Sequence, residues 1–62
     1  MWVLVSAFMA DVPKDTVDLV AKYMEEHRRA YPSDVALALG LSFEETTTIF
    51  EQLSREGVIK QI

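Results

Sequence analysis

Apolar residues recur at helical spacing in the first half of the chain, between about residues 13 and 30. The residues that share this three- and four-residue spacing are Val17, Val20, Ala21 and Met24, and Leu19, Tyr23 and Ala30 widen the apolar arc. This period of about 3.6 predicts an amphipathic helix from Pro13 to Ala30, with Asp15 or Asp11 as its capping residue.

The opposite arc of this predicted helix is charged. Glu25 and Arg29 have the four-residue spacing that favours an ion pair within a helix. His27, Arg28 and Arg29 form the basic cluster of the chain. At the carboxyl end of a helix, positive charge complements the helix dipole, and a phosphate contact is the alternative role for this cluster.

Two helix starts and two glycine stops follow in the run YPSDVALALGLSFEETTTIFEQLSREG, from residue 31 to residue 57. Ser33 is expected to cap a short helix that ends at Leu39, and Gly40 to take the left-handed stop position. Ser42, with Glu45 three residues later, has the spacing of a capping box and predicts a second helix that ends at Gly57. Together these signals predict a helix-turn-helix.

The second helix of this pair is amphipathic. Its expected buried face consists of Phe43, Thr46, Ile49, Phe50 and Leu53. The outward face then carries Glu44, Glu45, Thr48, Glu51, Gln52, Arg55 and Glu56. Four acids on this face oppose one base, so the predicted outward face is acidic.

Short strands are expected at both ends of the chain, at Trp2–Val5 and at Val58–Ile62, and they are expected to pair with each other. Both faces of the first strand are apolar. Trp2, Leu4 and Phe8 lie on one face, and Val3, Val5 and Ala7 on the other. Either a second copy of the chain contacts Trp2, Val3 and Val5, or the strand is buried within one protomer.

The 62 residues predict one domain, 1–62, of mainly α class: a three-helix helix-turn-helix core with short amino- and carboxyl-terminal β-strands. A domain of this size buries only about 60% of the surface that its unfolded chain exposes. Homodimer formation through the first strand would add buried surface. The apolar start has no basic leader and is too short to span a bilayer, so we expect a cytoplasmic protein without a membrane contact.

Charge and motifs narrow the possible functions. The net charge of −4 opposes general attraction to phosphate, which excludes a purely electrostatic DNA binder. There is no cysteine, and His27 is the only histidine, so we expect no metal site. No nucleophile elbow, glycine-rich phosphate loop or H-E-x-x-H helix occurs, so we expect neither enzymatic activity nor a cofactor.

Residues 15 to 60 resemble the winged helix-turn-helix domains of archaeal and bacterial transcription regulators. The features that carry the resemblance are the Pro32-Ser33 entry, the alternating Ala and Leu of the short helix, the turn Gly40-Leu41-Ser42, and the close with Leu53, Arg55, Glu56, Gly57, Val58 and Ile59. The resemblance implies that the helix beginning at Ser42 is a recognition helix and that the strand from Val58 enters a β-hairpin wing. Because the sequence stops at Ile62, we expect this wing to be truncated, absent or supplied differently.

The resemblance implies binding of double-stranded DNA and a role in transcription regulation. The candidate DNA contacts are Ser42, Thr47, Thr48, Arg55 and Lys60. Each also has a structural explanation: Ser42 as a cap, for example, and Lys60 as protection of an edge strand. The alternative function is a protein-protein interaction module, in which the acidic third helix contacts a basic partner or the first strand joins another sheet edge.

Overall fold

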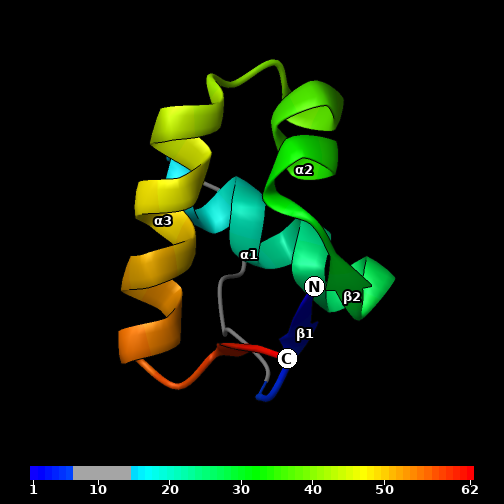
Figure 1. Ribbon diagram of the computed structural model, residues 1–62, viewed down its shortest axis with the longest axis vertical. Coiled ribbons are helices and arrows are strands. Elements are labelled where there is room, and N and C mark those ends of the chain that lie inside the picture. Colours follow the sequence, from blue (N-terminus) through cyan, green and yellow to red (C-terminus); the bar gives the residue numbers. More distant parts are fainter. Residues whose placement is uncertain (7–14) are drawn as a thin grey trace.

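A computed structural model describes residues 1–6 and 15–62 of the chain. Three helices lie on one side of a small sheet (Figure 1). The elements in chain order are β1 (Trp2–Leu4), α1 (Thr16–His27), β2 (Arg29–Ala30), α2 (Pro32–Leu39), α3 (Phe43–Arg55) and β3 (Ile59–Gln61). The predicted class, mainly α with a helix-turn-helix core and short flanking strands in a winged-helix-like layout, is confirmed.

Helix α1 is capped by Asp15, one of the two predicted capping residues, and it ends earlier than predicted. The Asp15 side chain caps it by accepting a hydrogen bond of 3.1 Å from the Asp18 N–H. The alternative cap Asp11 and the first-turn Pro13 lie outside the described residues. The prediction that the helix continues to Ala30 is wrong, because Arg28 leaves the helical conformation with a φ of 71°.

Pairing with the first strand ends α1. The carbonyl of Arg28 accepts a hydrogen bond of 2.7 Å from the Leu4 N–H, and Arg29 and Ala30 pair with β1 as strand β2. The predicted helical pair of Glu25 with Arg29 is therefore wrong, because Arg29 lies in a strand. His27 alone of the basic cluster remains in the helix.

Helix α2 is capped differently from the prediction. Tyr31 is its N-cap residue, without a capping side chain, and Pro32 is the first helical residue. Proline suits this position because its fixed φ matches the helix and its missing N–H would have no partner there. Ser33 lies inside the first turn, so the prediction that it caps the helix is wrong.

The turn between α2 and α3 follows the prediction. Gly40 adopts a φ of 70°, the left-handed conformation in which glycine avoids the steric cost of a side chain. The N–H of Leu41 donates to the carbonyl of Ala36 over 2.9 Å. The Ser42 hydroxyl then caps α3 by accepting a 3.1 Å hydrogen bond from the Glu45 N–H.

The sheet has the strand order β2-β1-β3, and both pairings are antiparallel. The predicted pairing of the two terminal strands is confirmed, with Trp2 opposite Gln61 and Leu4 opposite Ile59. The two chain ends lie beside each other, and the Ile62 N–H donates to the Met1 carbonyl over 2.9 Å (Figure 1). Thus β3, the strand that would enter a wing, pairs with β1 from the other end of the sequence.

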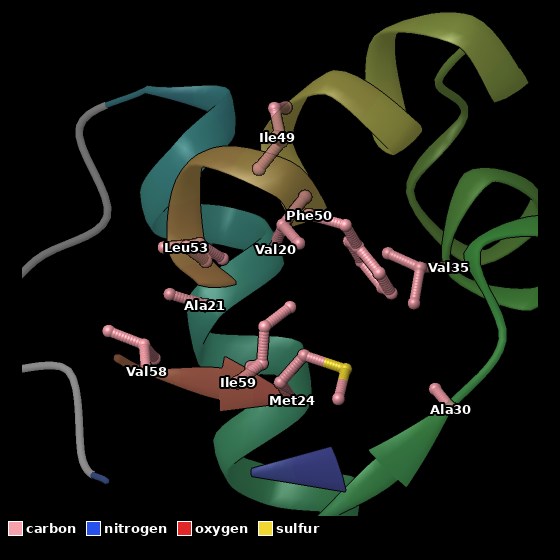
Figure 2. Close-up of a cluster of buried hydrophobic side chains, with 10 residues drawn as sticks. All are labelled: Val20, Ala21, Met24, Ala30, Val35, Ile49, Phe50, Leu53, Val58 and Ile59. Carbon is pink, nitrogen blue, oxygen red and sulfur yellow. The ribbon is translucent and has the colours of Figure 1, made fainter. Parts of the chain in front are cut away.

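The core lies where the three helices meet the inner face of the sheet. Figure 2 shows Phe50 of α3 between Val20 of α1 and Val35 of α2. Met24 of α1 and Ile59 of β3 lie at the sheet side of this cluster. The other members of the buried cluster are Ala21, Ala30, Ile49, Leu53 and Val58. All three helices therefore depend on one another for their buried faces.

Trp2 contributes to this core from the inner face of β1. Its ring packs edge-on against the Phe50 ring, with 5.4 Å between centroids and an interplanar angle of 79°. Leu4 also packs against the cluster. The Ser6 hydroxyl donates to the Gly57 carbonyl over 3.0 Å, which fixes the end of β1 to the turn after α3. The predicted positions of Ala7 and Phe8 lie outside the described residues.

Candidate interaction surface

Helix α3 presents a well-defined face to solvent because its other face is fully used in the core. Thr46, Ile49, Phe50 and Leu53 are buried, and the Thr46 hydroxyl donates to the Ser42 carbonyl over 2.9 Å. At about 100° per residue, the opposite side consists of Glu44, Thr48, Glu51 and Arg55, all exposed. We call these four residues the outward face of α3.

Glutamates are the most regular feature of this face. Glu44 and Glu51 are seven residues apart, which is two turns of helix, or about 10 Å. Thr48 lies between them. Glu45 and Glu56 are exposed on a neighbouring part of the helix, so negative charge extends along most of α3. The sequence predicted this acidic character correctly.

The threonine hydroxyls of α3 point back to the helix. Thr47 donates to the Phe43 carbonyl over 2.9 Å, and Thr48 donates to the Glu44 carbonyl over 3.0 Å. Each hydroxyl has one hydrogen, which is used in these bonds, so the oxygen can only accept a further bond. Phosphate oxygens are also acceptors. In this arrangement Thr47 and Thr48 therefore have no proton to donate to a DNA backbone.

Phe43 does not join the core, and its predicted burial is wrong. Its side chain is 60% exposed, whereas Phe50 is fully buried. The two lie on nearly the same side of the helix, but Phe43 is the first helical residue, two turns before Phe50. Leu37, on the side of α2 away from the core, is 84% exposed. Large apolar side chains are thus exposed on both helices of the helix-turn-helix.

A shallow hollow lies beside the first turns of α3. It has a volume of about 370 Å³ and opens widely to solvent. Its lining residues are Ser42, Glu44, Glu45, Thr48 and Ile49. Two acidic, two hydroxyl and one apolar side chain therefore line it, and the two carboxylates favour a cationic group over a phosphate.

The five candidate DNA contacts come from two elements, α3 with its cap and β3. Ser42 lies at the start of α3, where its hydroxyl is the helix cap. Thr48 and Arg55 lie on the outward face, and Thr47 is half-buried on its flank. Lys60 lies on β3, beyond the end of a helix that spans about 20 Å. Four of the five candidates therefore lie on or next to α3, and the fifth lies on the sheet.

The strand register places a second charged surface on the sheet, which sequence reasoning missed. Val3 of β1 lies directly opposite Arg29 of β2 and Lys60 of β3. Cross-strand partners project from the same face of a sheet. Because Trp2 and Leu4 point to the core, this row points away from it; we call Val3, Arg29 and Lys60 the outer sheet face. The sequence pattern placed Arg29 in a helix, so it did not predict that Arg29 lies in the sheet beside Val3 and Lys60.

The three predicted dimer contacts are divided between the two faces of β1. Trp2 packs against Phe50 within the protomer. Val3 lies on the outer sheet face, and Val5 is 58% exposed. Both edges of β1 are paired, so this strand has no free edge with which to extend another sheet.

His27 stacks on its own helix. Its ring lies 4.0 Å from the Tyr23 ring, with an interplanar angle of 14°, and its Nδ1 is 3.0 Å from the Tyr23 carbonyl oxygen. Within residues 1–6 and 15–62, no group of three or more His, Cys, Asp or Glu side chains is placed to hold a metal ion. In the same residues, no helix combines the length and apolarity needed to cross a membrane.

Comparison with known proteins assigns this chain to no family. No family model, no curated protein and no solved structure matches this chain.

Proposed function

We propose that this chain is a winged-helix-like interaction domain that binds a protein surface, and that the outward face of α3 contacts basic side chains of that partner. The observation that carries the proposal is the pair Glu44 and Glu51, with a threonine between them whose hydroxyl is bonded back to the helix. Location in the cytoplasm, expected from the sequence, is part of the same proposal.

Charge argues for a protein partner rather than a DNA groove. A helix in the major groove lies between two rows of phosphates, and its carboxylates are repelled unless a cation neutralises them. Thr47 and Thr48 use their hydroxyl protons within the helix, so Gln52 and the single cation Arg55 are the exposed donors near this face. A basic protein surface instead gains favourable charge contacts with the carboxylates.

Exposed apolar side chains support a protein partner independently. Phe43 and Leu37 offer aromatic and aliphatic surface at the helix-turn-helix. Protein interfaces commonly have such apolar residues near polar and charged ones, and aromatic residues are enriched there. We therefore expect the partner to combine cationic and apolar side chains.

The test uses a short synthetic peptide of alternating lysine and leucine as the probe, with its affinity measured by calorimetry. Replacing Glu44 and Glu51 by glutamine should weaken binding roughly fivefold, since two exposed ion pairs of about 0.5 kcal/mol each are lost. The matched control replaces Glu25 and Glu26 on α1 by glutamine, with the same change of net charge, and should alter the affinity much less. Equal weakening by both pairs would mean that the peptide senses only net charge, and would contradict the proposal.

A second candidate function is DNA binding, as the resemblance implies. The observation that favours it is the outer sheet face, where Arg29 and Lys60 are exposed on either side of Val3. If DNA is bound, this basic row is a better phosphate contact than the acidic α3. Replacing Arg29 and Lys60 by glutamate should then abolish a gel shift with duplex DNA at low salt.

A further inference from the structure

The outer sheet face has a charge pattern that restricts what can cover it. Arg29 and Lys60 are exposed on the two edge strands, and Val3 lies between them on the central strand. Adjacent strands are about 4.8 Å apart, so the two cationic residues are about 10 Å apart across the sheet. The row thus consists of a cation, an apolar side chain and a second cation.

This pattern disfavours a symmetric dimer in which two sheets pack face to face. Such a contact would bring Arg29 and Lys60 of one protomer close to the same residues of its partner. Like charges in close contact are destabilising, and desolvation adds to the cost. A suitable occupant must therefore supply negative charge at a matching spacing.

The outward face of α3 has that spacing. Glu44 and Glu51 are two helical turns apart, or about 10 Å, the same separation as that of the two cations. Thr48 lies between the glutamates, and its hydroxyl is bonded to the Glu44 carbonyl. Its methyl group remains to contact the valine of the row. From Glu44 to Glu51, charge and apolar positions therefore match along one line, and Arg55 lies one turn beyond this span.

From this match we propose that the outer sheet face binds α3 of a second copy of this chain, with the helix lying across the three strands. Each glutamate contacts one cation, and Thr48 contacts Val3. The inference rests on the proposed function and deepens it, because it names the basic protein partner as another copy of this chain. The contact is heterologous, so each copy carries both complementary surfaces and association continues with rising concentration unless a ring closes.

Charge reversal on one surface at a time tests this contact by sedimentation velocity. The sheet variant is Arg29→Glu with Lys60→Glu, and the helix variant is Glu44→Lys with Glu51→Lys. At about 0.01 M salt, where screening acts only beyond about 30 Å, wild type should associate with rising concentration, and at about 0.15 M salt much less. Each variant alone should be monomeric, with an association constant at least tenfold below wild type.

An equimolar mixture of the two variants is the decisive sample. The reversed sheet of one should bind the reversed helix of the other, and the mixture should regain association within about threefold of wild type. Circular dichroism of each variant checks that it is folded. The matched control is Glu25→Lys with Glu26→Lys on α1, which has the same net charge as the helix variant and should associate as wild type does.

Three outcomes would overturn the inference: wild type that is monomeric at low salt, a reversed variant that associates as wild type does, or a mixture that stays monomeric. The proposed function would survive these outcomes if neutralising Glu44 and Glu51 still weakens peptide binding selectively. Conversely, equal weakening of peptide binding by both glutamine pairs would contradict the proposed function, and restored association in the mixture would then support the self-contact alone.

Discussion

At the scale of single residues, burial depends on how far the neighbouring elements extend. The sequence pattern places Phe43 and Phe50 on one apolar face, and only Phe50 is buried. Helical periodicity gives the direction of a side chain around its axis, but it does not show where along the helix the packing partners stop. Figure 2 shows Phe50 between Val20 and Val35, and the Trp2 ring packs edge-on against it. Phe43 lies two turns earlier, at the start of α3.

Truncation of these two phenylalanines should have very different effects. Phe50→Ala removes a fully buried ring and should lower the free energy of unfolding by about 3–5 kcal/mol. A domain of this size has roughly 3–9 kcal/mol in total, so little of the variant should remain folded. Phe43→Ala should change it by less than about 0.5 kcal/mol. Urea unfolding followed by circular dichroism measures both, and comparable losses would contradict the placement of Phe43.

At the scale of elements, local signals in the sequence predicted most helix ends, but they misplaced the cap of α2 and the end of α1. Ser42 and Gly40 act as predicted, because capping and left-handed turns depend on adjacent residues. Helix α1 instead ends at His27, because Arg28 and Arg29 pair with β1, which is distant in sequence. The pairing holds Arg28 at positive φ, a conformation that no local pattern indicates for arginine.

The two serines near the helix starts give a direct test of the caps. Ser42→Ala removes the hydroxyl that accepts the Glu45 N–H and should lower the free energy of unfolding by about 1 kcal/mol. Ser33→Ala changes a residue inside α2 and should be neutral or stabilising by a few tenths of a kcal/mol, about the difference in helix propensity. Thermal unfolding of both variants distinguishes them. If Ser33→Ala lowered the free energy of unfolding more than Ser42→Ala does, Ser33 would be the more important capping residue, contrary to the structure.

At the scale of the whole molecule, the fold separates charges that are mixed along the sequence. Acidic residues dominate the exposed side of α3, and Arg29 and Lys60 lie together on the sheet. The acidic helix face was predictable, since helical spacing alone defines it. The basic row was not, because it depends on the register of three strands from separate parts of the chain. The sequence therefore predicted the acidic surface on α3 but not the basic surface on the sheet.

In the proposed function, the outward face of α3 binds protein and not duplex DNA. The most direct measurement follows backbone amide chemical shifts while short duplex DNA is added at about 0.01 M salt, where charge contacts are weakly screened. We predict that the amides of Glu44, Thr48 and Glu51 do not move; shifts confined to Val3, Arg29 and Lys60 would support the second candidate function through the sheet. Saturable shifts along the outward face of α3 would contradict the account.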